Sequence, residues 1–119
     1  MYEGEIILSP KRDGKTWVVL KDLMFYTKYT DWVKVVSPFE TDMASIPKFL
    51  YSIIGGSASG KYRQAAICHD YLYSIKIVSR YKADLAFLEL MLNDEVPRWK
   101  AYLMFAAVRM FGSKHYGSG

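Results

Sequence analysis

The sequence has a single cysteine, Cys68, and no long apolar run. One cysteine cannot form an internal disulfide, so a small secreted domain held together by disulfides is excluded. No stretch approaches the ~18 uninterrupted apolar residues of a membrane-spanning helix, and the N-terminus lacks the basic start and apolar core of a signal peptide. Neither sign of charge is scarce, because the sequence contains 16 Lys and Arg and 12 Asp and Glu. The resulting charge of +4 permits an anionic partner without requiring one.

The chain is rich in apolar material, with 51% hydrophobic residues among its 119. That content suffices for one packed core, and the length is too short for a two-domain enzyme. We therefore expect a single domain over residues 1–116, with residues 117–119 as a linker remnant.

Short runs of β-forming residues occupy the first 36 positions, and turn residues such as Pro10 and Asp13-Gly14 separate them. These runs are Glu5 to Leu8, Thr16 to Leu20, Leu23 to Tyr26 and Asp31 to Val36. They predict two antiparallel hairpins. Residues 37–61 contain two prolines and three glycines and predict irregular loops, where binding and catalytic groups are often placed.

A helical period follows residue 61. It predicts helices over residues 62–73, 80–92 and 97–111, with Pro97 in a first turn and Gly112 as a stop. The fold class predicted is α+β, an N-terminal antiparallel β part followed by three C-terminal helices.

The first of these helices contains a polar pair, His69 and Asp70, in an otherwise apolar and aromatic segment. His69 and Tyr73 are four residues apart and share a face, while Asp70 points about a quarter-turn away. In the next helix, Asp84 borders a predicted buried stripe of Ala83, Phe87 and Met91.

If these two helices pack antiparallel, Asp84 can reach His69 and fix its tautomer. The histidine would then activate water, and a metal held by Asp70 would stabilise an oxyanion. This hypothesis requires one imidazole nitrogen within ~2.6–3.2 Å of an Asp84 oxygen and the other nitrogen facing a cleft. The alternative is a structural polar cluster, in which protein groups satisfy both nitrogens and an arginine pairs with Asp70.

Thr41, Asp42 and Ser45 either form a turn bonded to its own backbone or present a polar rim to His69 that binds substrate. Lys11, Arg12 and Lys15 flank a predicted hairpin tip, and such a cluster is typical of a solvated turn. Because no helix-turn-helix or zinc motif is present, we do not expect a nucleic-acid partner.

An ordered series of motifs resembles a family of small bacteriophage and prophage proteins that is catalogued as a domain of unknown function. The motifs span residues 37 to 112 and are Phe39 to Pro47, Ala65-Ala66, His69 to Tyr73, Arg80, Ala83-Asp84, Ala107 to Arg109 and Phe111-Gly112. Met43 stands where that family usually has glycine. The resemblance implies a phage origin and supplies no activity.

The pattern His69-Asp70-x-x-Tyr73, with Asp84 on the next helix, is also similar to the small calcium-dependent phospholipases of the A-two type. This resemblance implies that His69 activates water, Asp70 binds calcium, Asp84 supports His69 and Tyr73 adds a hydrogen bond. Those enzymes carry disulfides, which this chain cannot form, and take further calcium ligands from a glycine-rich loop, for which Gly55-Gly56 is the candidate.

Two functions remain open from the sequence. The first is a phage-encoded esterase or phospholipase-like hydrolase that acts at a lipid membrane surface. The second is a non-catalytic protein that binds phage virion proteins, such as a tail or baseplate component, or that inhibits a host defence. The expected location is the host cytoplasm or the phage particle.

Overall fold

A computed structural model describes residues 2–13, 16–41 and 63–112. These residues form six strands and three helices. The strands are β1 (Tyr2–Glu3), β2 (Leu8–Pro10), β3 (Trp17–Val19), β4 (Leu23–Thr27), β5 (Asp31–Val35) and β6 (Phe39–Thr41). The helices are α2 (Arg63–Ile75), α3 (Arg80–Asn93) and α4 (Arg98–Phe111). The predicted α+β class is confirmed.

The strands make two antiparallel sheets, in the orders β1-β4-β5 and β2-β3-β6. The two predicted hairpins are the pairs β2–β3 and β4–β5. The predicted first strand, residues 5–8, was misplaced, because pairing begins at Leu8. The short strands β1 and β6 were not predicted. They exist because β4 and β3 offer them a partner edge, which a local pattern does not reveal.

The pair β4–β5 shows the alternation of a sheet with one buried face. Phe25 lies opposite Val33 in the register, and both are buried, whereas Tyr26 and Trp32 face outward as the next pair. The two outward rings are in contact, with centroids 5.5 Å apart. Strand β4 is also in contact with α3.

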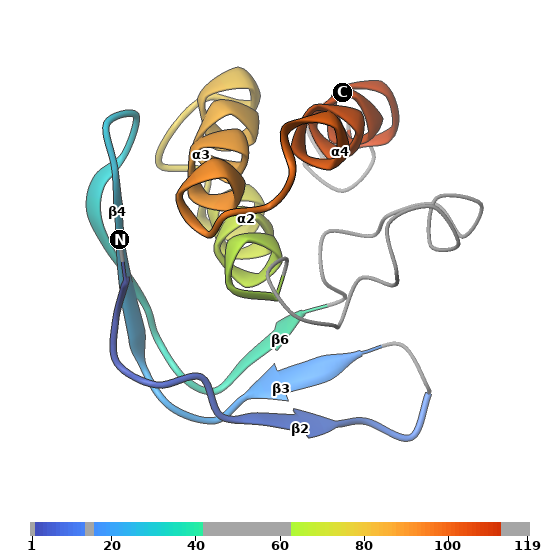
Figure 1. Cartoon of the computed structure of the whole chain (residues 1–119). Coiled ribbons are helices and arrows are strands. Elements are labelled where there is room, and N and C mark those ends of the chain that lie inside the picture. Colours follow the sequence, from blue (N-terminus) through green and yellow to red (C-terminus); the bar gives the residue numbers. More distant parts are fainter. Residues whose placement is uncertain (1, 14–15, 42–62, 113–119) are drawn as a thin grey trace.

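The two sheets run along two sides of the molecule, and the helices lie inside the angle between them (Figure 1). Helix α2 is central, since it packs on α3 and on β6. Its residues 65–69 are all buried, which leaves little of it exposed to water. A polar side chain on this helix therefore needs partners inside the protein.

The helix ends follow the expected chemistry. Ser79 is the N-cap of α3, and its hydroxyl accepts a hydrogen bond from the backbone N–H of Lys82 at 3.2 Å. Pro97 is the N-cap of α4 and thus precedes its first turn, and Gly112 is the C-cap. Within the described ranges, no helix has the length and apolar content to cross a membrane.

Candidate functional site

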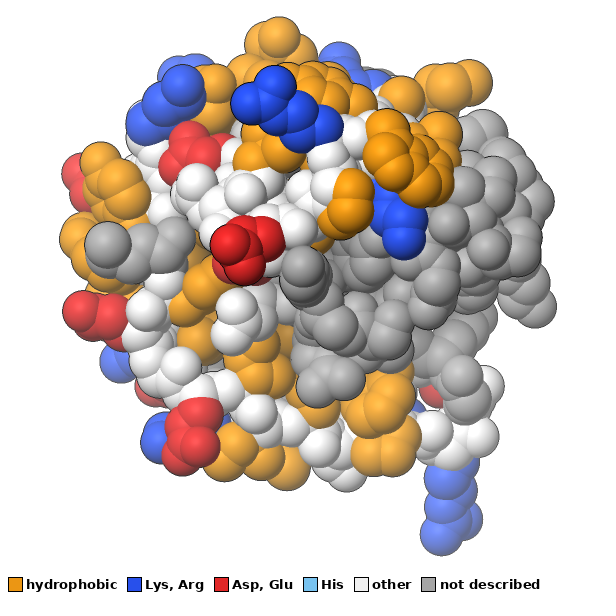
Figure 2. All heavy atoms as spheres, in the orientation of Figure 1, with side chains coloured by type: hydrophobic (Ala, Val, Ile, Leu, Met, Phe, Trp, Pro, Cys, Tyr) orange, Lys and Arg blue, Asp and Glu red, His pale blue; other side chains and the backbone are white. Residues whose placement is uncertain are grey.

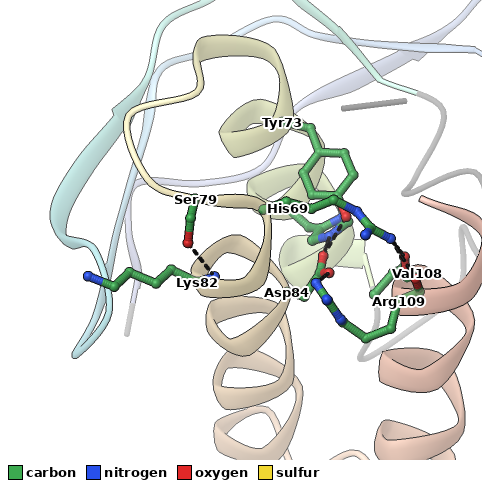
Figure 3. Close-up of polar contacts among 8 residues, drawn as sticks. His69, Tyr73, Ser79, Lys82, Asp84, Val108 and Arg109 are labelled. Carbon is green, nitrogen blue, oxygen red and sulfur yellow. Dashed lines mark hydrogen bonds and ion pairs between the residues drawn. The ribbon is translucent and has the colours of Figure 1, made fainter. Parts of the chain in front are cut away.

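The predicted contact between α2 and α3 is present. His69 Nε2 lies 2.7 Å from Asp84 Oδ1, within the expected range (Figure 3). The apolar stripe of α3 explains where Asp84 lies. Ala83, Phe87 and Met91 are fully buried, α3 packs on α2, and Phe87 contacts the His69 ring, so the neighbouring Asp84 is placed beside α2. Asp84 is itself 0% exposed, so the carboxyl belongs to the interior of the helical layer.

Two further donors, one from α2 and one from α4, also contact Asp84. The Tyr73 hydroxyl donates to Oδ1 at 2.5 Å, and Arg109 Nη1, from α4, donates to Oδ2 at 2.8 Å (Figure 3). Burial by itself would raise the pKa of Asp84, but the hydrogen bonds from His69, Tyr73 and Arg109 outweigh it and lower this pKa. Asp84 is therefore a carboxylate that accepts from all three partners.

The negative charge of Asp84 determines which ring nitrogen of His69 carries the hydrogen. A carboxylate only accepts hydrogen bonds, so Nε2 must carry the hydrogen that it donates to Asp84. In the neutral imidazole, Nδ1 then holds a lone pair. Nδ1 is buried and has no hydrogen-bond partner in the described part of the chain. Among these residues it therefore neither faces the cleft that the hydrolytic hypothesis requires nor has the protein partner that the structural alternative predicts. An unsatisfied buried ring nitrogen is uncommon in a purely structural cluster.

Aromatic rings hold the imidazole in place. The His69 ring centroid lies 4.2 Å from that of Tyr73 and 4.7 Å from that of Phe87. Burial and the hydrogen bond to Asp84 raise the pKa of Tyr73, so its hydroxyl stays protonated and donates. The ring of His69 therefore has little freedom to turn away from Asp84.

A second arginine joins α3 to the end of α4. Arg80 Nη2 donates to the carbonyl oxygens of Val108 and Arg109, at 2.8 and 2.6 Å. These carbonyls are among the last of α4, where a cation is favourable. Gly112 lies beside them, and a Cβ there would stand 2.7 Å from the Tyr73 hydroxyl oxygen. Glycine thus leaves room for the hydrogen bond of Tyr73 to Asp84.

The sequence did not predict the contact between Arg109 and Asp84. It predicted an arginine only as a partner of Asp70. The available signal was a lone cation in the last turn of an apolar helix, Arg109, within a motif that also contains Gly112. The signal does not say which carboxylate the arginine meets.

The other predicted site residues are less completely described. Asp70 lies on α2 and is half-buried. Thr41 ends β6 and is buried. Phe39 of the same strand packs edge-on against Tyr71, at 5.0 Å between centroids, so β6 lies against the helix that carries His69. Asp42, Ser45 and the predicted loop around Gly55-Gly56 are outside the described residues.

Calcium requires six to eight oxygen ligands. The described residues contain no group of three or more His, Cys, Asp or Glu side chains placed to share a metal ion. Asp70 is the predicted calcium ligand in this part of the chain, and the predicted loop around Gly55-Gly56 lies outside it. Calcium binding by Asp70 therefore stays a prediction.

We expect stability to fall more steeply in acid for the wild type than for Asp84→Asn. The folded-state pKa of Asp84 is lowered, so its stabilising contribution is present above about pH 4, the value for a carboxyl in an unfolded chain. The contribution is lost as the pH falls through the lower folded-state pKa. Urea unfolding at a series of pH values measures this effect.

Asp94→Asn is the control, and its effect on the acid dependence of stability should have the opposite sign. Burial raises the pKa of Asp94, so this group favours the folded state when it is protonated. Its removal should make the acid loss steeper than in the wild type. Equal pH dependence of the wild type and Asp84→Asn would contradict a depressed Asp84 pKa.

Comparisons with known proteins give a family and no activity. Residues 17–108 match the family described as "Protein of unknown function (DUF1353)". The uncharacterized protein y4jT of Sinorhizobium fredii is 39% identical over 71 residues, which cover 60% of this chain and 21% of that protein. The uncharacterized protein y4iH of the same organism is 32% identical over 75 residues, which cover 63% of this chain and 31% of that protein.

The chain thus spans less than a third of the length of either relative. No solved structure matches it. Because the family match covers most of the chain, from the strand β3 to the last turn of α4, this protein belongs to the DUF1353 family of unknown function.

Proposed function

We propose that the protein hydrolyses carboxylic esters and that His69 is the general base. The observation that carries this proposal is the asymmetry of the imidazole: Nε2 is bonded to Asp84, and Nδ1 has no partner among the described residues. A general base needs one nitrogen held and the other available to accept a proton.

The chemistry follows from that asymmetry. Nδ1 takes a proton from a water molecule while the water oxygen forms a bond to the ester carbonyl carbon. The imidazolium that results is stabilised by the carboxylate of Asp84, 2.7 Å from Nε2. The proton then passes from Nδ1 to the leaving alkoxide as the carbon–oxygen bond breaks, which yields an acid and an alcohol.

Asp84 and Tyr73 act through His69. Tyr73 and Arg109 hold the two oxygens of Asp84, so the carboxylate cannot rotate away from the ring. These are the roles that the similarity to A-two phospholipases implies for the later aspartate and the tyrosine. That similarity also suggests phospholipid acyl esters as the first substrate class to test, with Asp70 as the residue to vary for calcium dependence.

The contrasting function is structural, and a specific observation favours it. The His69 side chain is 2% exposed, and Arg109 already balances the charge of Asp84. A cluster of this kind can simply join three helices in a protein that binds phage virion proteins or a host factor. Under the hydrolase proposal, by contrast, substrate must displace the groups that cover Nδ1.

A lipid-release assay separates the two. Release of fatty acid from phosphatidylcholine, and hydrolysis of a short chromogenic ester, are measured with calcium and with a chelator. We expect His69→Ala to lower the rate by about 100- to 10,000-fold, the usual contribution of a general base. Cys68→Ala is the matched control, since Cys68 is also fully buried on α2 and takes no part in the proposed chemistry. Equal release by both variants, or none by the wild type, would refute hydrolysis.

A further inference from the structure

One end of the helical layer combines exposed apolar side chains with cations. The end comprises the α2–α3 connection, the first turn of α3 and the last turn of α4, which Figure 3 shows together around Ser79, Tyr73 and Arg109. Contacts fix this grouping. Arg80 donates to the carbonyl oxygen of Arg109 at 2.6 Å, and the Arg109 guanidinium lies 5.0 Å from the centre of the Tyr81 ring.

Large apolar side chains are exposed at this end. Ile77 is 58% exposed, Tyr81 55% and Met110 71%, and Ile75 is partly exposed beside them. Ile75 and Ile77 stand on either side of the tight connection at Lys76, whose φ is 55°. Isolated exposed apolar residues need no explanation, but several on adjoining elements indicate a contact surface.

The charge at this end has one sign. Residues 74–82 and 106–112 contain Lys76, Arg80, Lys82 and Arg109 and no Asp or Glu. The nearest acidic residue in either helix is Asp84, which is fully buried and paired with Arg109. The opposite end of α3 differs, because Asp94 and Glu95 follow it, and Figure 2 shows acidic, basic and hydrophobic side chains mixed over that face.

We propose that this end, defined by Ile75, Lys76, Ile77, Tyr81, Lys82 and Met110, docks on the surface of an anionic lipid bilayer. Apolar side chains at a loop tip can enter the boundary between headgroups and acyl chains, and interleaved cations meet the negative headgroups. An acidic protein would complement the cations but would not require isoleucine and methionine to be exposed. Docking here would bring the His69 cluster near the lipid, because Arg109 borders both.

Binding is measured separately from hydrolysis by using ether-linked lipids, which have no ester to cleave. We expect the wild type to cosediment with vesicles of equal parts phosphatidylcholine and phosphatidylserine, and much less with phosphatidylcholine alone or in high salt. The double variant Lys76→Glu/Lys82→Glu should bind about 30-fold more weakly, from the loss of two cations near the surface. Lys82 points away from the His69 cluster in Figure 3, so the substitution of Lys82 leaves the contacts of His69 in place.

The matched control is Arg12→Glu/Lys21→Glu, which changes the net charge by the same amount at two exposed positions in the β part. It should bind nearly as well as the wild type. Equal loss in the two double variants would show a general charge effect and overturn the proposal, as would a wild type that does not bind the mixed vesicles.

Ile77→Ser/Met110→Ser tests the apolar contact, and we expect about tenfold weaker binding to vesicles from the lost apolar area. Heparin, a soluble polyanion, distinguishes lipid from other anions. If heparin retains the wild type and the serine variant equally while vesicles retain neither, the surface binds polyanions and the lipid proposal is wrong. Because the lipids cannot be hydrolysed, these outcomes do not depend on whether His69 is catalytic.

Discussion

Replacement of Asp84 by alanine should lower the free energy of unfolding by about 3–5 kcal/mol, the range for removing one partner of a buried ion pair. The carboxylate accepts hydrogen bonds from three side chains on two other helices, His69 and Tyr73 of α2 and Arg109 of α4, at 2.5 to 2.8 Å. The variant leaves the donors of His69 and Tyr73 buried without an acceptor, and α4 loses its bond to α3 through Arg109. Urea or guanidinium unfolding, followed by circular dichroism, measures the loss.

Two controls make the result specific. Asp84→Asn keeps the side-chain volume and one acceptor oxygen, so its free energy of unfolding should lie between those of the wild type and Asp84→Ala. Glu40→Ala breaks an exposed ion pair of 2.9 Å with Lys11, and such pairs contribute only about 0–1 kcal/mol. If Asp84→Ala costs no more than Glu40→Ala, the buried cluster does not join the helices.

Phe87→Ala should be comparably damaging, with a loss of about 3–5 kcal/mol. Phe87 is fully buried, and its ring centroid lies 4.7 Å from that of His69. The substitution removes apolar contacts and leaves a cavity beside the imidazole. The same unfolding experiment measures the loss. In proton NMR spectra, the resonances of the His69 ring should broaden as the ring gains freedom.

Phe87→Leu and Tyr102→Ala are the controls for this prediction. Leucine refills most of the space, so Phe87→Leu should cost clearly less than alanine. Tyr102 is 52% exposed on α4, and a surface change of this kind usually stays within about 0.5 kcal/mol. Similar costs for Phe87→Ala and Tyr102→Ala would contradict the placement of Phe87 in the core.

The contact of His69 with Asp84 was predictable because both ends of it are local. Helical spacing places His69 and Tyr73 on one face of α2 and Asp84 beside the stripe of α3. A short connection between the two helices forces them to pack antiparallel. The contact between His69 and Asp84 then follows from the helical periods of α2 and α3 and the short connection between them. No other helix or strand is needed to predict it.

The contacts made by α4 were not predictable in the same way. Arg109 is 25 residues from Asp84 in the chain, and its guanidinium could reach several carboxylates. Arg109 binds Asp84 and Arg80 binds backbone carbonyls, and the pairing of an arginine with Asp70 stays a prediction. The choice depends on how α4 crosses α3, which is set by the packing of apolar faces and not by any local pattern.

By itself, the sequence determined the α+β order, the two hairpins, the three helices and the pairing of His69 with Asp84, because hydrophobic periodicity and turn residues act over a few neighbouring positions. Only the tertiary structure decided that Arg109 shares Asp84, that Nδ1 of His69 is buried, and that β1 and β6 add a strand to each sheet. Strands of two or three residues and long-range charge pairs have no stable form alone, since the surfaces that stabilise them come from distant parts of the chain.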